Sequence, residues 1–112
     1  MPTIKAPFGA VETVTLSATG AQAITISNDV TYLDGVTTIA TGNRTLNLTI
    51  DSETKVGARI FVASKTTGTE TTIAGTGIIM PTITGAAGKI KVTELFYNGT
   101  TFYATSAGYQ ID

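Results

Sequence analysis

The stretch Arg44–Ile50, which reads Arg-Thr-Leu-Asn-Leu-Thr-Ile, decides the fold class of this chain. Its apolar residues Leu46, Leu48 and Ile50 stand at every second position, and Thr or Asn fills each position between them. Side chains on a β-strand point alternately to its two faces, so this period of two predicts a strand with one buried and one polar face. The pattern is typical of a half-buried antiparallel sheet.

The same period of two recurs from Val11 to the C-terminus, and Gly, Asn and Asp interrupt it at short intervals. No segment sustains the period of an amphipathic helix. We therefore predict an all-β fold, either a small antiparallel β-sandwich of jelly-roll-like type or a barrel, with about eight or nine short strands. The expected strands are residues 11–16, 23–27, 30–33, 36–40, 44–50, 59–64, 70–74, 89–97 and 100–105.

We expect one β domain over residues 11–112, preceded by an extended N-terminal arm over residues 1–10. A chain of 112 residues has the usual size of a single domain. Proline cannot donate a ladder hydrogen bond, so Pro2 and Pro7 favour irregular or extended backbone in the arm. Ile4 and Phe8 are the apolar residues with which the arm could anchor itself.

Two dipeptides predict tight hairpins. Asp34-Gly35 and Asn98-Gly99 both favour the type I′ turn, because its two central residues need positive φ. A two-residue loop at Asn98-Gly99 would place Leu95 opposite Phe102 on the neighbouring strand. We therefore expect a hairpin at each of these dipeptides.

The last hairpin carries apolar side chains on both faces, Leu95 and Phe102 on one and Phe96 and Tyr103 on the other. A two-layer domain buries only one face of each sheet. Either an irregular register near Glu94 brings both faces inside this chain, or one face packs on a neighbouring subunit. The predicted subunit-interface residues are Leu95, Phe96, Phe102 and Tyr103.

The chain is rich in Thr and poor in charge. Thr provides 24 of the 112 residues, whereas Lys, Arg, Asp and Glu together make up 13% and leave a net charge of −1. Ordinary soluble domains carry about 25% charged residues. Copies with such a surface repel one another weakly. We expect much of it to be covered in an oligomer or larger assembly, and a Thr-covered monomer is the alternative.

The sequence argues against several classes of partner. It has no basic stripe, so we expect no nucleic-acid binding. It has no long apolar segment, so we expect no membrane span. Residues 1–20 contain no apolar run of the signal-peptide type, so we expect synthesis in a cytoplasm.

Few residues of the chain are of a type that could catalyse a reaction or bind a metal ion. The chain lacks His and Cys, so we predict neither an enzyme nor a cofactor. Ser64-Lys65 is a weak candidate for a nucleophile with a base. Glu94 is the one acid within an apolar strand, where a salt bridge is its expected role. Acidic residues near turns could hold a weak calcium ion but more often serve the turns themselves; these are Asp29, Asp34, Asp51 and Glu53.

Four stretches carry a resemblance to a known class of proteins. They are residues 48–62, 69–78, 84–89 and 96–103, within the segment from Leu46 to Asp112. In this segment the chain resembles small structural proteins of tailed bacteriophages, namely head-fibre and capsid-decoration proteins and related fibre domains. The resemblance implies a compact β domain, usually trimeric, displayed on the surface of a virion. It assigns no functional residue.

The function expected from this resemblance is that of a structural virion protein, made in the host cytoplasm, that decorates or stabilises the capsid surface as a homotrimer. Its partner would be the major capsid protein or another virion protein. The predicted capsid contacts are Ile4 and Phe8 in the arm and Ile79 and Met80 in the Gly-rich stretch 75–88.

The alternative function is a receptor- or glycan-binding module of a tail fibre or adhesin. It requires an exposed aromatic platform. The candidate residues are Tyr97, Tyr103 and Tyr109.

Overall fold

The structure is a computed structural model that describes residues 11–112 of the chain. These residues form eleven β-strands and no helix, which confirms the all-β class. The predicted arm, with Ile4 and Phe8, lies outside the described residues. The strands are β1 (Val11–Thr15), β2 (Gly20–Ile26), β3 (Val30–Ala40), β4 (Arg44–Ile50), β5 (Arg59–Thr66), β6 (Thr71–Ala74), β7 (Ile78–Ile79), β8 (Ile83–Thr84), β9 (Ile90–Tyr97), β10 (Phe102–Ala104) and β11 (Tyr109–Gln110).

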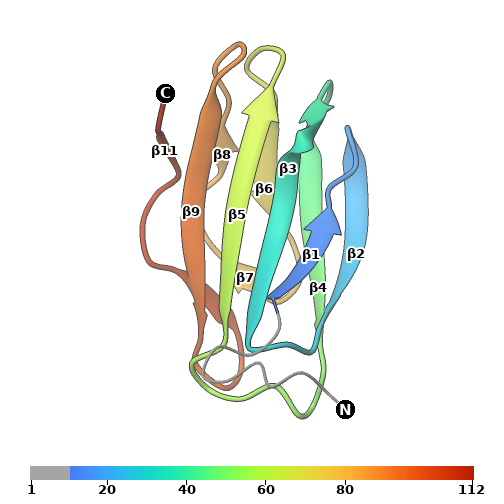
Figure 1. The fold of residues 1–112 in the computed structure, drawn as a ribbon, viewed down its shortest axis with the longest axis vertical. Coiled ribbons are helices and arrows are strands. Elements are labelled where there is room, and N and C mark those ends of the chain that lie inside the picture. The colour runs from blue at the N-terminus through green and yellow to red at the C-terminus, as the bar shows by residue number, and fades with distance from the viewer. Residues whose placement is uncertain (1–10) are drawn as a thin grey trace, which may run out of the picture.

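The strands form two mixed sheets that lie face to face (Figure 1). Sheet A has the order β1-β3-β5-β9-β10-β7, and β11 also pairs with β9. Sheet B has the order β2-β4-β6-β8. Neither sheet closes on itself, so β1 and β7 are end strands of sheet A and β2 and β8 are end strands of sheet B.

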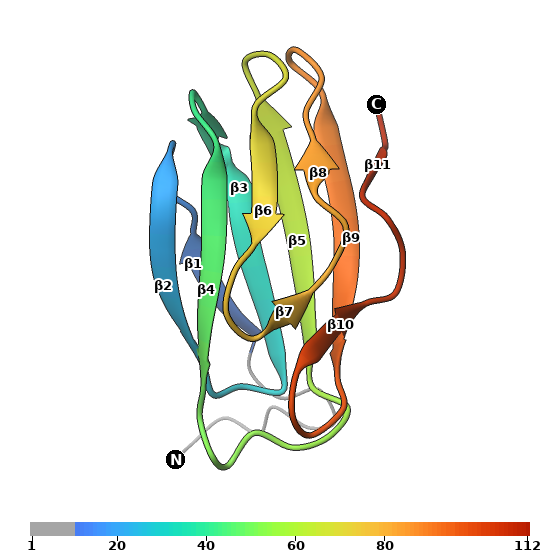
Figure 2. The same cartoon turned by 180° about the vertical axis from the view of Figure 1, so that it is seen from behind.

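The first six strands alternate between the two sheets along the chain. β1, β3 and β5 lie side by side in sheet A, β2, β4 and β6 lie side by side in sheet B, and all of these pairings are parallel. The chain therefore winds along one sheet, crosses over and returns along the other (Figures 1 and 2). The antiparallel prediction is wrong for this half, because a period of two is common to both directions of pairing.

The second half of the chain supplies the antiparallel strands. β9 pairs antiparallel with β5, and β10 and β11 both pair antiparallel with β9. β8 pairs antiparallel with β6, whereas β7 is parallel to β10. These strands cover the edges of β5 and β6 that the winding leaves open. The antiparallel prediction is correct for the pairings made by β8 and β9.

The hydrophobic core lies between the two sheets. β4 contributes Leu46 and Leu48 to it, as the alternation in the sequence predicts. The rings of Tyr97 and Phe102 stack at its end with 4.8 Å between their centroids. The buried residues of the core are Leu16, Ile24, Ile26, Leu33, Leu46, Leu48, Ala58, Ile60, Val62, Ile78, Leu95, Tyr97 and Phe102.

Asp34-Gly35 forms no hairpin, and the prediction of one is wrong. β3 runs through both residues, and its register with β5 shifts between Gly35 and Ala40. The Asp34 carboxylate accepts hydrogen bonds from the Val36 amide (2.9 Å) and from the amide and hydroxyl of Thr37 (3.0 and 2.6 Å). These bonds satisfy the backbone at an irregularity within the strand, so the same local chemistry that favours a turn here supports a bulge.

The last hairpin forms where predicted, but its register differs. Its loop spans four residues, so Phe102 lies opposite Tyr97 rather than opposite Leu95. The Asn98 side-chain oxygen accepts hydrogen bonds from the amides of residues 100 and 101, both at 2.9 Å. These two bonds extend the turn by two residues and shift every cross-strand pair that follows.

Candidate functional site: an exposed apolar sheet face and a buried arginine

The pleat of β5 separates the Ser64-Lys65 pair. Ser64 points into the protein, where its hydroxyl bonds to Arg44 (3.1 Å) and to the Thr72 hydroxyl (3.2 Å). Lys65 is the next residue of the same strand and points to the opposite face. The two side chains therefore cannot form a nucleophile–base pair.

A buried arginine ties the two sheets together. Arg44 is the first residue of β4 in sheet B, and only 1% of it is exposed. Its guanidinium donates to four acceptors, the backbone oxygens of Ser17 (2.8 Å), Gly35 (3.2 Å) and Thr38 and the hydroxyl of Ser64. These acceptors belong to β3, to β5 and to the connection between β1 and β2. One side chain of sheet B thus fixes three segments on the sheet A side.

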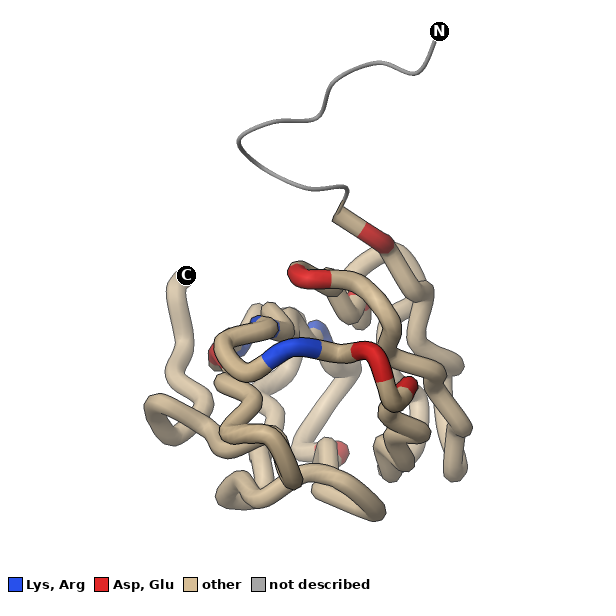
Figure 3. Tube along the Cα trace, turned by 90° about the horizontal axis from the view of Figure 1, so that it is seen from below, with Lys and Arg blue, Asp and Glu red and all other residues tan. Residues whose placement is uncertain are grey.

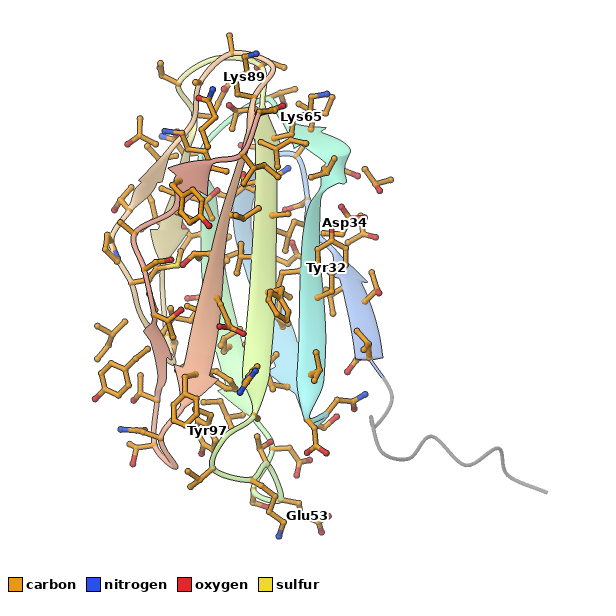
Figure 4. All side chains as sticks on the ribbon, turned by 60° about the vertical axis from the view of Figure 1, so that its left-hand side comes forward. Tyr32, Asp34, Glu53, Lys65, Lys89 and Tyr97 are labelled. Carbon is orange, nitrogen blue, oxygen red and sulfur yellow. The ribbon has the colours of Figure 1, made fainter. Side chains whose placement is uncertain are left out.

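The ionisable groups around Arg44 have shifted pKa values. Hydrogen bonds from the hydroxyl and amide of Thr37 and from the Val36 amide lower the pKa of the Asp34 carboxyl, and the charge of Arg44 adds to this lowering. Burial lowers the pKa of the Arg44 guanidinium, while the charge of Asp34 opposes that change. Burial and the charge of Asp34 raise the pKa of the Tyr32 hydroxyl, and Figure 4 shows both residues on β3. Both charged side chains of this cluster are occupied by bonds to their own chain, so its role is structural.

The acidic residues have local partners. Glu94 lies 3.9 Å from Arg59, which confirms the salt bridge expected for it. Asp34 stabilises the bulge in β3, and Asp51 accepts a hydrogen bond from the Glu53 amide at 2.8 Å. Over residues 11–112, no three His, Cys, Asp or Glu side chains gather as a metal site would require.

The outer face of sheet A carries a cluster of partly exposed apolar residues. The strand register places on the side away from the core the large residues Val11, Val30, Tyr32, Phe61, Ile90, Val92, Phe96 and Tyr103, together with Thr13, Thr15, Asp34, Arg59, Lys65 and Glu94. Phe61 on the central strand β5 is 47% exposed, and Phe96 on the neighbouring strand β9 is 40% exposed. The outward side of a solvated sheet normally carries polar residues, so this face stands out on the described surface.

The outer face of sheet B is built differently. Its strands present Ala23, Thr25, Asn47 and Thr49 to the outside, and Ile73 is the one large apolar residue among the described residues of that face. Small polar side chains of this kind suit a sheet surface in contact with water. The two sheets therefore share one core but expose opposite chemistries.

The structure separates the residues predicted for the subunit interface into two groups. Leu95 and Phe102 are fully buried core residues, whereas Phe96 and Tyr103 are exposed. Leu95 and Phe102 lie on the face of the hairpin that this chain covers, together with Tyr97, so Phe96 and Tyr103 are the two of the four that are available to a neighbouring subunit. The residue that sequence reasoning missed is Phe61, although the signal was present: residues 59–64 are apolar on both faces.

The other predicted contact residues are also divided. Ile79 is exposed, whereas Met80 packs partly against the core. Of the tyrosines proposed as an aromatic platform, Tyr97 is buried, and Tyr103 and Tyr109 are 42% and 60% exposed. Ile4 and Phe8 lie outside the described residues.

Comparison of the chain with protein-family models, with curated proteins and with solved structures found no match. In the described part of the chain, no helix has the length and apolar character needed to cross a bilayer.

Proposed function

We propose that this chain is a structural virion protein of a bacteriophage, which decorates or stabilises the capsid surface as a homotrimer. The observation that carries the proposal is the apolar outer face of sheet A on a chain with few charges. Figure 3 shows how sparsely charged residues occur along the trace. The resemblance of residues 46–112 to phage head-fibre and capsid-decoration proteins supports the same function.

The physical argument rests on burial. Removing apolar surface from water contributes about 25 cal/mol per Å², so covering an exposed aromatic face favours association even after the cost of ordering the partners. The face-to-face arrangement of the two sheets is also what a sandwich requires, although the parallel pairing of the first six strands differs from the antiparallel jelly-roll-like type expected from the sequence. Such a rigid domain can hold an interaction surface in place without any catalytic group.

The proposed contacts with the capsid are Ile79 and residues of the N-terminal arm. Ile79 belongs to β7, an end strand of sheet A, so it lies away from the centre of the apolar face. The register places Ile79 beside Tyr103 at the margin of that face, so Ile79 can contact the major capsid protein while the centre of the face stays available to other copies of the chain.

Two measurements test this proposal. Light scattering on a sizing column should give a native mass of three times 11.5 kDa. The purified protein should also co-sediment with capsids of the phage that encodes it, and Ile79→Ser should weaken this binding without changing the native mass. A monomeric mass contradicts the homotrimer, and a protein that stays in the supernatant contradicts the capsid function.

A second candidate function is receptor or glycan binding, favoured by the exposure of Tyr103 and Tyr109. An aromatic ring stacks on the apolar face of a sugar, so two exposed rings can serve as a platform. A glycan array probed with the purified protein tests this function. Binding that is lost in Tyr109→Ala would support it, and an array without a signal would contradict it.

A further inference from the structure

We propose that the outer face of sheet A is the surface through which copies of this chain associate, with Phe61 closest to the symmetry axis. This inference rests on the proposed homotrimer and specifies its interface. It replaces the hairpin surface expected from the sequence, because two of those four residues lie in the core.

The position of Phe61 supports its central role. β5 lies between β3 and β9, so Phe61 has Tyr32 on one side and Glu94 on the other. Its neighbours in the chain, Ile60 and Val62, point into the core and are almost fully buried. The inner side of β5 is therefore covered by this chain, whereas its outer side presents the exposed Phe61 beside Arg59.

The size of the face fits a stable interface. Five strands about 4.8 Å apart (β1, β3, β5, β9 and β10) make the face about 24 Å wide, and the 39 residues in all strands of sheet A, at about 3.3 Å each, cover roughly 600 Å². The resulting area of about 600 Å² is close to the ~800 Å² that each partner contributes to a standard interface.

The width of the face also fits a threefold arrangement. Three sheets about 24 Å wide that form the sides of a triangle would each lie about 7 Å from the threefold axis. This distance is comparable with the spacing of about 10 Å between two packed sheets, which side chains fill. Aromatic side chains at the centre of each sheet can fill that space. A second copy is therefore an occupant of the right dimensions.

The charges near the centre of the face do not oppose association. Arg59 and Glu94 point outwards beside Phe61 and Phe96, and they form an ion pair at 3.9 Å. One cation and one anion leave this region neutral, so like copies do not repel each other there. Either charge can also pair with its counterpart on a neighbouring copy.

The first test compares one serine substitution on each sheet. Phe61→Ser should weaken the trimer by at least about 100-fold in dissociation constant, as expected for a central aromatic residue of an interface. Ile73→Ser is the matched control on the outer face of sheet B and should leave the native mass unchanged. Circular dichroism melts of both variants show whether each remains folded. A folded Phe61→Ser variant that is as trimeric as the control would overturn the inference.

A cysteine cross-link provides a second readout that does not depend on weakening the trimer. The chain has no cysteine, so a Phe61→Cys variant carries a single thiol. At about 7 Å from a threefold axis the thiols of two copies would lie about 12 Å apart, too far for a direct disulfide. A bifunctional thiol reagent of that span should therefore join two copies of Phe61→Cys, whereas it should not join copies of Thr49→Cys on sheet B. A trimeric Phe61→Cys variant without a cross-link would place the interface elsewhere.

The outcomes separate this inference from the proposed function. A monomeric unmodified protein would overturn the homotrimer and the association face together. An unmodified trimer with no response at Phe61 would overturn only the face. Alkylation of the Phe61→Cys thiol distinguishes the other possible occupants of the face. If the protein is a monomer and capsid protein or the N-terminal arm protects this thiol, that occupant covers the face and self-association is overturned.

Discussion

At the scale of single residues, the interior of this protein contains one polar group without a partner. The Thr31 hydroxyl is fully buried on β3 and, among the described side chains, is the only such atom that makes no hydrogen bond. A buried hydroxyl that gives up water without gaining a partner destabilises the folded state.

Thr31→Val should therefore raise the free energy of unfolding by about 1 kcal/mol, because it removes the unsatisfied hydroxyl and nearly preserves the volume. Urea unfolding measures the change. Thr66→Val is the matched control and should destabilise the protein, because the Thr66 hydroxyl bonds to the backbone oxygens of Gly68 (2.8 Å) and Ala86 (3.2 Å). Equal losses in the two variants would contradict the prediction.

Asp34 should make stability depend on pH in the acid range. Its pKa in the folded protein is lowered by hydrogen bonds from Thr37 and Val36, so the carboxylate stabilises the fold above its unfolded-state pKa. That contribution is lost as the pH falls through the lowered pKa. Asp34→Asn should therefore be less stable than the unmodified protein at neutral pH, and the difference should shrink towards low pH.

Unfolding curves between neutral and strongly acidic pH test this dependence. Asp29→Asn, at an exposed position, reports the general effect of removing one carboxylate. A stability difference for Asp34→Asn that stays constant with pH, or that matches the Asp29→Asn control, would show that the carboxylate does not carry the effect.

At the scale of elements, the irregularity in β3 depends on a residue without a side chain. A Cβ atom on Gly35 would lie 2.6 Å from the Ala63 backbone oxygen and still closer to the Arg44 guanidinium. Backbone from β5 and a buried side chain from β4 occupy the space, and neither can move without breaking hydrogen bonds.

Gly35→Ala should therefore destabilise the protein by about 2 kcal/mol or more, because it overpacks the contact between the sheets. Chemical denaturation compares it with Gly68→Ala, where the nearest atom to the new Cβ is a Glu70 carboxylate oxygen at 3.6 Å. The control should be close to neutral. Similar midpoints for the two variants would contradict the proposed crowding at Gly35.

The sequence was sufficient to predict most strands but not their partners. The alternation in residues 44–50 predicts β4 with its observed limits, because one face of that strand is buried and the other is not. Alternation carries no information on strand direction, so the parallel winding could not be predicted from it. The two-residue strands β7, β8 and β11 are too short to show a period.

The candidate site shows the same limit. Phe61 was recognisable as part of a strand that is apolar on both faces, but its exposure depends on what covers β5 in three dimensions. Arg44 is in phase with Leu46, Leu48 and Ile50, so the alternation places it on the buried face, but nothing in the sequence shows which groups would accept its hydrogen bonds there. Its acceptors on residues 17, 35, 38 and 64 come together only through the folding of both sheets.

At the scale of the whole molecule, sheet B gives the protein a polar side, and sheet A gives it a side with a cluster of exposed apolar residues, called here the apolar side. Association through the apolar side would be driven mainly by burial rather than by charge. The native mass should therefore stay the same between about 0.1 and 1 M sodium chloride, because salt at these concentrations screens exposed charges but leaves apolar burial effective. Light scattering at both salt concentrations measures this, and dissociation at the higher one would point to an interface dominated by ion pairs.

The winding of the first six strands means that both sheets could be widened by adding further circuits of the chain. Val11 lies beside Val30 and Val30 beside Arg59, so residues 30–58 form one complete circuit through both sheets. An in-frame duplication of that circuit would insert one strand into each sheet and push the N-terminal end outwards by about 4.8 Å. The closing strands at the other end would keep their partners. Evolution or a designer could thus change the reach of the domain in fixed steps by copying a short piece of its coding sequence.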